Sequence, residues 1–326
     1  MIKLFREKSI VAILALVVLC FLIHSHLFFT PITIATSNSD GLLNVLLQKA
    51  ALTVHPIALS IGYIVVLLLQ AIRLNFVLDN SKMFNKPGFT IAFAYILLSG
   101  LFVNAFYISP ALIANTFIIG IVNVALKLYN NPSPNKLLFN LGFISSISFI
   151  LYQPSIILAV SLFFALGILR SFKPTEWFIL VIGVLAPIYL VMSGLYLTNH
   201  FIIITKLLPQ FQIKLNVIKD AWHWYNVTIL LLLAIAGFIV WYPNSNRMVI
   251  QIRKSWLVML ILFLLSIVVV AFFNNKNYTP ELLCMPTLAA FVANFLLYPK
   301  KTIIINILLL AAIVALVYNN AQLIPS

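Results

Sequence analysis

The chain has 326 residues, of which 63% are hydrophobic and 8% are charged, and its mean hydropathy is +1.12. A water-soluble fold is excluded, because a soluble domain typically carries about 25% charged residues. In a soluble protein the formal net charge of +14 would indicate nucleic-acid binding. Here we expect no nucleic-acid partner and interpret the cations as topological signals facing anionic lipid headgroups.

Apolar runs of about the length that crosses a bilayer recur along the whole chain. A spanning helix needs ~20 apolar residues, and these runs end at charged residues or at Pro and Asn. The first run follows Lys3, Arg6 and Lys8 but lacks a small-residue cleavage site, so we interpret it as a span and not as a removable signal. Spans are predicted near residues 9–29, 56–72, 89–107, 110–126, 137–152, 154–169, 177–197, 227–241, 256–273, 282–298 and 303–318. The sequence therefore predicts an all-α polytopic membrane protein, with about eleven spans in a single integral membrane domain over residues 1–326.

One apolar stretch, residues 137–169, is interrupted by Tyr152, Gln153 and Pro154. Proline removes a helical hydrogen bond and starts new helices readily. We expect either two short spans or one hairpin that does not cross fully, and the sequence leaves both open.

The distribution of basic residues predicts the orientation. With the N-terminus in the cytoplasm, 15 of the 20 Lys and Arg residues fall in six successive cytoplasmic segments. This bias is what the positive-inside rule requires. We therefore expect a multi-pass protein of the bacterial inner membrane, with a cytoplasmic N-terminus and a periplasmic C-terminus.

Two long connections are predicted on the outer face, at residues 30–55 and 198–226. In the first, residues 41–52 read as an amphipathic helix, with Leu42, Leu43, Leu46, Leu47 and Ala50 on one face and Asn44 and Gln48 on another. In the second, apolar and polar residues alternate over 211–217, which indicates an extended segment, and 222–225 form an aromatic belt.

The acidic residues limit where chemistry can occur. Only Asp40, Asp220 and Glu281 fall on the predicted outer face. Asp40 precedes the amphipathic helix and is the candidate catalytic carboxylate. The competing interpretation is that Asp40 caps this helix near Gly41.

Candidate substrate-binding residues lie in and near the second outer connection. Lys206, Lys214 and His223, together with Glu281, form a set that can bind the phosphate of a lipid carrier. Ordinary contact with anionic headgroups explains the same cations equally well.

Metal and redox chemistry receive little support. His24, His26 and His55 are expected at the outer interface, and no carboxylate or Cys completes a ligand spacing, so no metal site is predicted. Cys20 and Cys284 lie in apolar segments and are interpreted as small core residues.

The spans hold uncharged amides, such as Gln70 and Asn115, and no ionisable residue near a span's middle. This argues against an ion-coupled transporter, and the amides are expected to join helices by hydrogen bonds. No nucleotide-binding or hydrolase motif is present.

Two stretches carry a family resemblance: AIRLNFVLDNSKMFNKPGFTIAFAYILLSGLFVNAFYISPALIANTFIIGIVNVALKLYNN and GFISSISFILYQPSIILAVSLFFALGILRSFKPTEWFILVIGVLAPIYL. They resemble an uncharacterised group of polytopic membrane proteins from Bacteroidota. The chain is also distantly similar to integral membrane glycosyltransferases of the C-type fold, in which long outer loops and an amphipathic helix surround paired short spans.

The resemblance implies sugar transfer from a polyprenyl-phosphate donor at the outer face. Asp40 would then be a general base or a metal-facing carboxylate, with a divalent cation as the candidate cofactor and membrane lipids and the polyprenyl-phosphate sugar as partners. The alternatives are a non-catalytic scaffold or assembly partner in envelope biogenesis or secretion, or a glycolipid flippase, which requires a polar lateral cavity.

Overall fold

The computed structural model of the chain describes residues 2–30, 32–34, 41–199, 221–273, 279–298 and 302–323. Within these ranges the fold is helical and contains no β-strand, which confirms the all-α prediction there. The α-helices are α1 (Ile2–Phe5), α2 (Ile10–Ile23), α3 (Leu42–Thr53), α4 (Pro56–Asn80), α5 (Thr90–Leu101), α6 (Pro110–Ala125), α7 (Asn135–Leu151), α8 (Ile156–Leu169), α9 (Pro174–Leu197), α11 (Ala221–Ser245), α12 (Ile250–Phe272), α13 (Met285–Leu297) and α14 (Thr302–Leu323). Short 3-10 helices are η1 (Ser25–Phe28), η2 (Val103–Phe106), η3 (Gln153–Ser155) and η5 (Thr279–Cys284).

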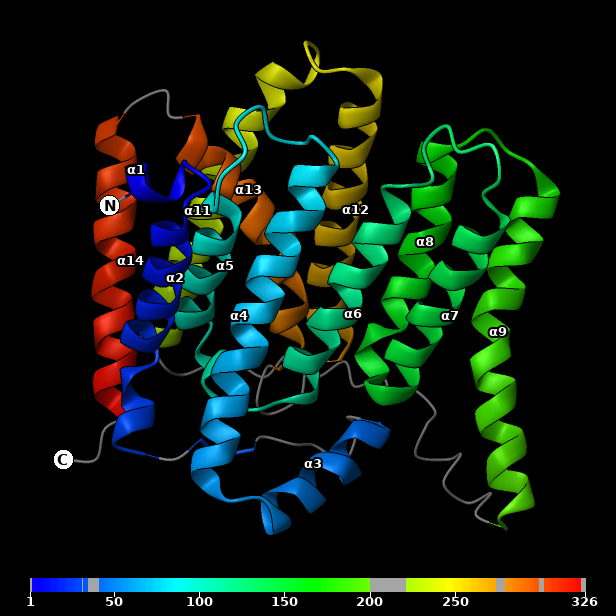
Figure 1. The fold of residues 1–326 in the computed structure, drawn as a ribbon, viewed down its shortest axis with the longest axis horizontal. Coiled ribbons are helices and arrows are strands. Elements are labelled where there is room, and N and C mark those ends of the chain that lie inside the picture. The colour runs from blue at the N-terminus through cyan, green and yellow to red at the C-terminus, as the bar shows by residue number, and fades with distance from the viewer. Residues whose placement is uncertain are drawn as a thin grey trace.

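The longer helices lie side by side in one bundle, and α3 lies across one end of it (Figure 1). The opposite end holds α1 and the connections that leave α4, α6, α8 and α11. We call these two ends the α3 end and the α1 end. Because α14 finishes at the α3 end, the described chain starts and finishes at opposite ends of the bundle.

In the described part of the chain, six helices are long and apolar enough to cross a membrane, judged by length and composition: α4, α9, α11, α12, α14 and the segment Pro280–Leu297 that contains α13. These helices indicate a membrane protein. The sequence predicts eleven spans, whereas this criterion gives six, because α2, α5, α6, α7 and α8 have only 12 to 17 residues each.

The bundle has protein-covered helices at its centre and apolar side chains on its outside. Every residue of α5 and of α13 is buried. Around them, large hydrophobic side chains face outward, with Leu69 of α4 61% exposed, Phe178 of α9 69% and Leu310 of α14 65%. An apolar exterior of this extent requires apolar surroundings, as a bilayer provides.

Helix α9 packs mainly on α7, through two glycines. A Cβ on Gly142 of α7 would lie 2.5 Å from the carbonyl oxygen of Leu180, and a Cβ on Gly183 of α9 would lie 2.6 Å from that of Phe139. The two backbones are therefore in direct contact, which is the typical use of small residues between membrane helices.

The interruption in residues 137–169 separates two helices, α7 and α8, which η3 joins. The backbone N–H of Ser155 bonds to the carbonyl of Tyr152, and the Ser148 hydroxyl donates to the Ser155 hydroxyl at 3.0 Å. The polar groups released at this break are thus bonded within the turn, at a place where the surrounding protein covers them.

Helix α3 occupies the position of the predicted amphipathic helix, but its buried face differs from the expected one. Leu43, Asn44 and Leu47 are buried, and Leu46 is 57% exposed. The expectation that Asn44 lies opposite the apolar face is therefore wrong, because α3 turns this side toward its contacts with α6 and α7. Gly41 is the N-cap, with a φ of 76° and with the carbonyl of Leu151 2.8 Å from where a Cβ would lie, so only glycine fits.

Candidate functional site

The predicted outer site is described in part. Asp40, Lys206 and Lys214 lie outside the described residues, as does the predicted extended segment 211–217. His223, in the first turn of α11, and Glu281, in η5, come together at the α3 end. Their side chains are only 13% and 17% exposed, and His223 Nε2 lies 3.6 Å from Glu281 Oε1. The structure therefore brings two of the predicted binding residues into one cluster.

The turn that presents His223 is fixed by Asn319 of α14. The Trp222 indole N–H donates to Asn319 Oδ1 at 2.7 Å, and Asn226 Nδ2 donates to the same oxygen at 3.2 Å. Asn319 Nδ2 in turn donates to the carbonyl of Gly100 on α5 at 3.0 Å. One amide thus joins α11, α14 and α5 through Trp222 and Asn226, which lie on either side of His223 in the sequence.

The next residue, Asn320, makes a matching set of contacts to the end of α2. Its Oδ1 accepts from the backbone N–H of His26 at 3.2 Å and lies 3.1 Å from the ring Nδ1 of His26. Its Nδ2 donates to the carbonyl of Ile23, a group that the end of α2 leaves without a helical partner. Asn320 therefore ties α14 to the end of α2.

A second histidine is sealed inside this region. His24 is fully buried, with Nε2 3.0 Å from the Ser99 hydroxyl and Nδ1 3.3 Å from the Tyr63 hydroxyl, which also donates to the carbonyl of Ala105. A serine beside an imidazole resembles a nucleophile with its base. Ser99 and Tyr63 are also buried, however, so the group has no surface at which a substrate could reach it, and its bonds join α2, α4 and α5.

His24 and His26, which are predicted near the outer interface, have side chains that are buried within the protein. Their hydrogen-bond partners inside the protein are Ser99 and Tyr63 for His24 and Asn320 for His26. His55, by contrast, is exposed and caps α4. Among the described residues no three His, Cys, Asp or Glu side chains form a group that could hold a metal ion.

The buried amide of Gln70 joins helices by hydrogen bonds, as expected from the sequence. Its Nε2 donates to the Leu112 carbonyl and to the Thr116 hydroxyl, both at 2.8 Å, and its Oε1 accepts from the Tyr95 hydroxyl at 2.7 Å. These contacts connect α4 with α5 and α6. Cys20 and Cys284 are free and buried, as expected for small core residues.

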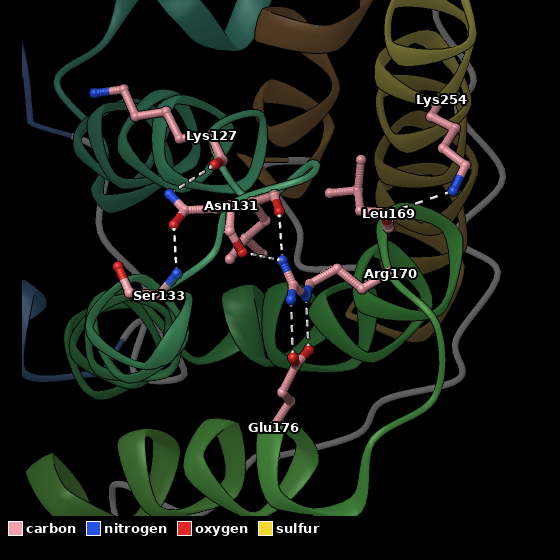
Figure 2. A network of polar contacts seen from close by, with 8 residues as sticks. Lys127, Asn131, Ser133, Leu169, Arg170, Glu176 and Lys254 are labelled. Atoms are coloured by element: carbon pink, nitrogen blue, oxygen red, sulfur yellow. Dashed lines mark hydrogen bonds and ion pairs between the residues drawn. The ribbon is translucent and has the colours of Figure 1, made fainter.

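The α1 end contains an ion pair that sequence reasoning did not predict (Figure 2). Arg170, at the end of α8, bonds both carboxylate oxygens of Glu176 on α9, at 2.8 and 3.0 Å. Its Nη1 also donates to the carbonyls of Leu128 and Asn131 in the connection from α6 to α7. Four donations occupy most of the guanidinium's five N–H groups, so Arg170 acts as a structural clamp between two connections.

The apolar bundle and the polar cluster at its α3 end define this chain as a helical membrane protein. The chain belongs to the family of unknown function DUF6427, whose family model matches residues 1–325. The match runs through every described helix, so the family corresponds to the whole bundle. No curated protein and no solved structure matches the chain.

Proposed function

We propose that the chain crosses the bacterial inner membrane eleven times, with its α1 end in the cytoplasm and its α3 end in the periplasm. The support is the placement of basic residues. Of the 20 Lys and Arg residues, 15 fall in segments assigned to the α1 end, among them Lys82, Lys86, Lys127, Lys173 and Arg247, and five fall in segments assigned to the α3 end: Lys49, Lys206, Lys214, Lys219 and Lys276. This asymmetry follows the positive-inside rule.

The chemical function that we propose is sugar transfer from a polyprenyl-phosphate donor at the α3 end. The observation that carries this proposal is the pair of His223 and Glu281, held 3.6 Å apart by elements from distant parts of the sequence. Glu281 orients the imidazole, which when protonated donates to the donor's phosphate. Lys206 and Lys214 supply further cations from the connection between α9 and α11, which both have an end at this face.

Asp40 is the proposed general base. The acceptor's hydroxyl oxygen attacks the anomeric carbon and forms the new C–O bond, while its proton passes to the Asp40 carboxylate. The bond from that carbon to the phosphate oxygen breaks, and polyprenyl phosphate leaves with the electron pair. His223, Lys206 and Lys214 stabilise the charge that develops on the phosphate. A divalent cation bound by Asp40 is the candidate cofactor for the same task.

The test uses cells that lack the chain, complemented with Asp40→Asn, with Glu281→Gln or with wild type. Polyprenyl-linked sugars and envelope glycans are then quantified by mass spectrometry. Loss of a general base typically lowers a rate by 10²–10⁴-fold, so Asp40→Asn should leave the lipid-linked donor accumulated. Glu7→Gln makes the same chemical change as Glu281→Gln at an exposed position of the α1 end and serves as the control. Wild-type glycan levels with both Asp40→Asn and Glu281→Gln would refute the proposal.

A second candidate function, a scaffold for envelope assembly, is favoured by one feature of α3. Val45, Leu46 and Leu52 are 50%, 57% and 89% exposed on a helix that lies outside the bundle. Such a face suits a protein partner or the membrane interface. A photo-crosslinking residue at position 52 distinguishes these cases, since a scaffold must yield one stoichiometric protein adduct, and adducts to lipid alone would count against it.

A further inference from the structure

A groove of about 480 Å³ opens on the outside of the bundle between α4 and α6. Helix α6 contributes Thr116 and Ile119, and one face of helix α4 contributes Val66, Leu69, Gln70, Ile72, Arg73 and Phe76. Most of this lining is apolar. The groove therefore has the shape and character to hold a hydrocarbon chain.

One cation, Arg73, lies in this apolar lining. It precedes the last residue of α4 by seven positions, which places its Cα about 10 Å short of the α1 end of the helix. Its Nη2 lies 3.7 Å from where a Cβ on Gly120 of α6 would be, so the guanidinium reaches across the groove to α6. The absence of a side chain at Gly120 leaves room for this approach.

Arg73 makes no ion pair and no hydrogen bond with the described part of the chain. Two other cations near this end have carboxylate partners, since Lys8 lies 3.3 Å from the Asp79 carboxylate and Arg170 lies 2.8 Å from that of Glu176. A guanidinium in apolar surroundings requires a counter-charge, and a lipid phosphate supplies one with matching bidentate geometry.

We propose that the groove between α4 and α6 binds an anionic diacyl phospholipid, whose phosphate pairs with Arg73 and whose acyl chain lies along Leu69 and Val66. The distance along α4 from Arg73 to Val66 is about 10 Å, enough for the upper part of one acyl chain. This inference requires only that the bundle lies in a membrane and is independent of sugar transfer.

The test measures binding of phosphatidylglycerol to the purified, delipidated full chain by native mass spectrometry. Wild type should retain one lipid molecule, and Arg73→Gln should weaken the binding at least tenfold. Arg253→Gln removes an exposed arginine of α12 outside this groove and should leave the binding unchanged. Equal weakening by both variants would show only general attraction to headgroups and would overturn the proposal.

A second variant keeps the test decisive if Arg73→Gln fails to fold. Leu69→Trp fills the groove at a side chain that is 61% exposed, so it leaves the packed interior intact. It should weaken phosphatidylglycerol binding while Arg73 remains. Unchanged binding with Leu69→Trp would show that the acyl chain does not lie in the groove.

Three further ligands identify what the groove recognises. Diacylglycerol lacks the phosphate and inorganic phosphate lacks the chain, so neither should displace phosphatidylglycerol at tenfold excess. Displacement by either would contradict the two-part site. Displacement by polyprenyl phosphate at a lower concentration than unlabelled phosphatidylglycerol would overturn the assignment of the occupant.

Discussion

Gly183 on α9 and Gly142 on α7 allow these two helices to touch backbone to backbone, and we predict that Gly183→Ala loosens α9 from the bundle. Helix α9 depends on this crossing because α7 is its main neighbour. Only 17% of the residues in the apolar stretch of α9 are buried, so few other contacts can compensate for a weaker crossing with α7.

The expected magnitude follows from the distances at the crossing. Ordinary contact begins at 3.4 Å, whereas the added Cβ at position 183 would lie 2.6 Å from the Phe139 carbonyl oxygen, so the helices must separate by about 0.8 Å. A gap of roughly that size removes a quarter to a half of the attraction in each contact across it. Overpacked sites typically lose about 1–3 kcal/mol, and we expect Gly183→Ala to lower the free energy of unfolding by about 2 kcal/mol.

The measurement is unfolding of the purified chain in mixed detergent with increasing dodecyl sulfate, followed by circular dichroism. Gly194→Ala is the matched control, because it makes the same change in the same helix and its Cβ would meet nothing within 4 Å. Equal stability of the two variants would refute the backbone-contact argument. In the double variant Gly142→Ala/Gly183→Ala the two losses should not add, since one separation of the helices relieves both clashes.

Two further predictions concern the α1 end and the topology. Arg170→Lys should destabilise the chain by about 3 kcal/mol in the same unfolding assay, because lysine cannot make the bidentate bond to Glu176. The control Lys173→Gln, at an exposed neighbour, should change the stability little. An equal loss of stability in both variants would contradict the role of Arg170 as a structural clamp. Lys86→Cys and Thr53→Cys should react with an impermeant maleimide from opposite sides of the membrane, because they lie at opposite ends of the bundle, while the native Cys20 and Cys284 are buried and should not interfere. Labelling of both from one side would refute the proposed topology.

Apolar runs in the sequence predicted where helices lie, because both lipid-facing and protein-covered helices of the bundle consist mostly of apolar side chains. They did not predict which helices are central. Helix α5 is wholly buried and α14 is largely exposed, yet both are strongly apolar, since the lipid-facing surface is as apolar as the core. Periodicity therefore carries little information about the buried face, and for α3 it placed Asn44 on the wrong side.

The site could be predicted only in part for a related reason. His223 and Glu281 were selected as rare polar groups on the predicted outer face, and this criterion does not depend on knowing which elements pack together. Asn319 and Asn320 were missed because adjacent asparagines also follow two other apolar runs, at 130–131 and 274–275, so the pair did not stand out in the sequence. Their partners are backbone carbonyls and residues far away in the chain, which become neighbours only in the folded bundle.

The central helices bear on the difference between the six helices that meet the length criterion and the eleven spans predicted from the sequence. A helix that faces lipid must bond all of its backbone groups internally over the full hydrocarbon thickness, but one that is covered by protein can be shorter and continue as 3-10 turns. Helix α5 has twelve residues and is followed by η2, and α13 has thirteen and is preceded by η5. The segment Pro280–Leu297 meets the length criterion only because η5 is counted with α13, and 89% of it is buried. A short length is therefore expected of a protein-covered helix such as α5, and the twelve residues of α5 do not count against the proposed crossings.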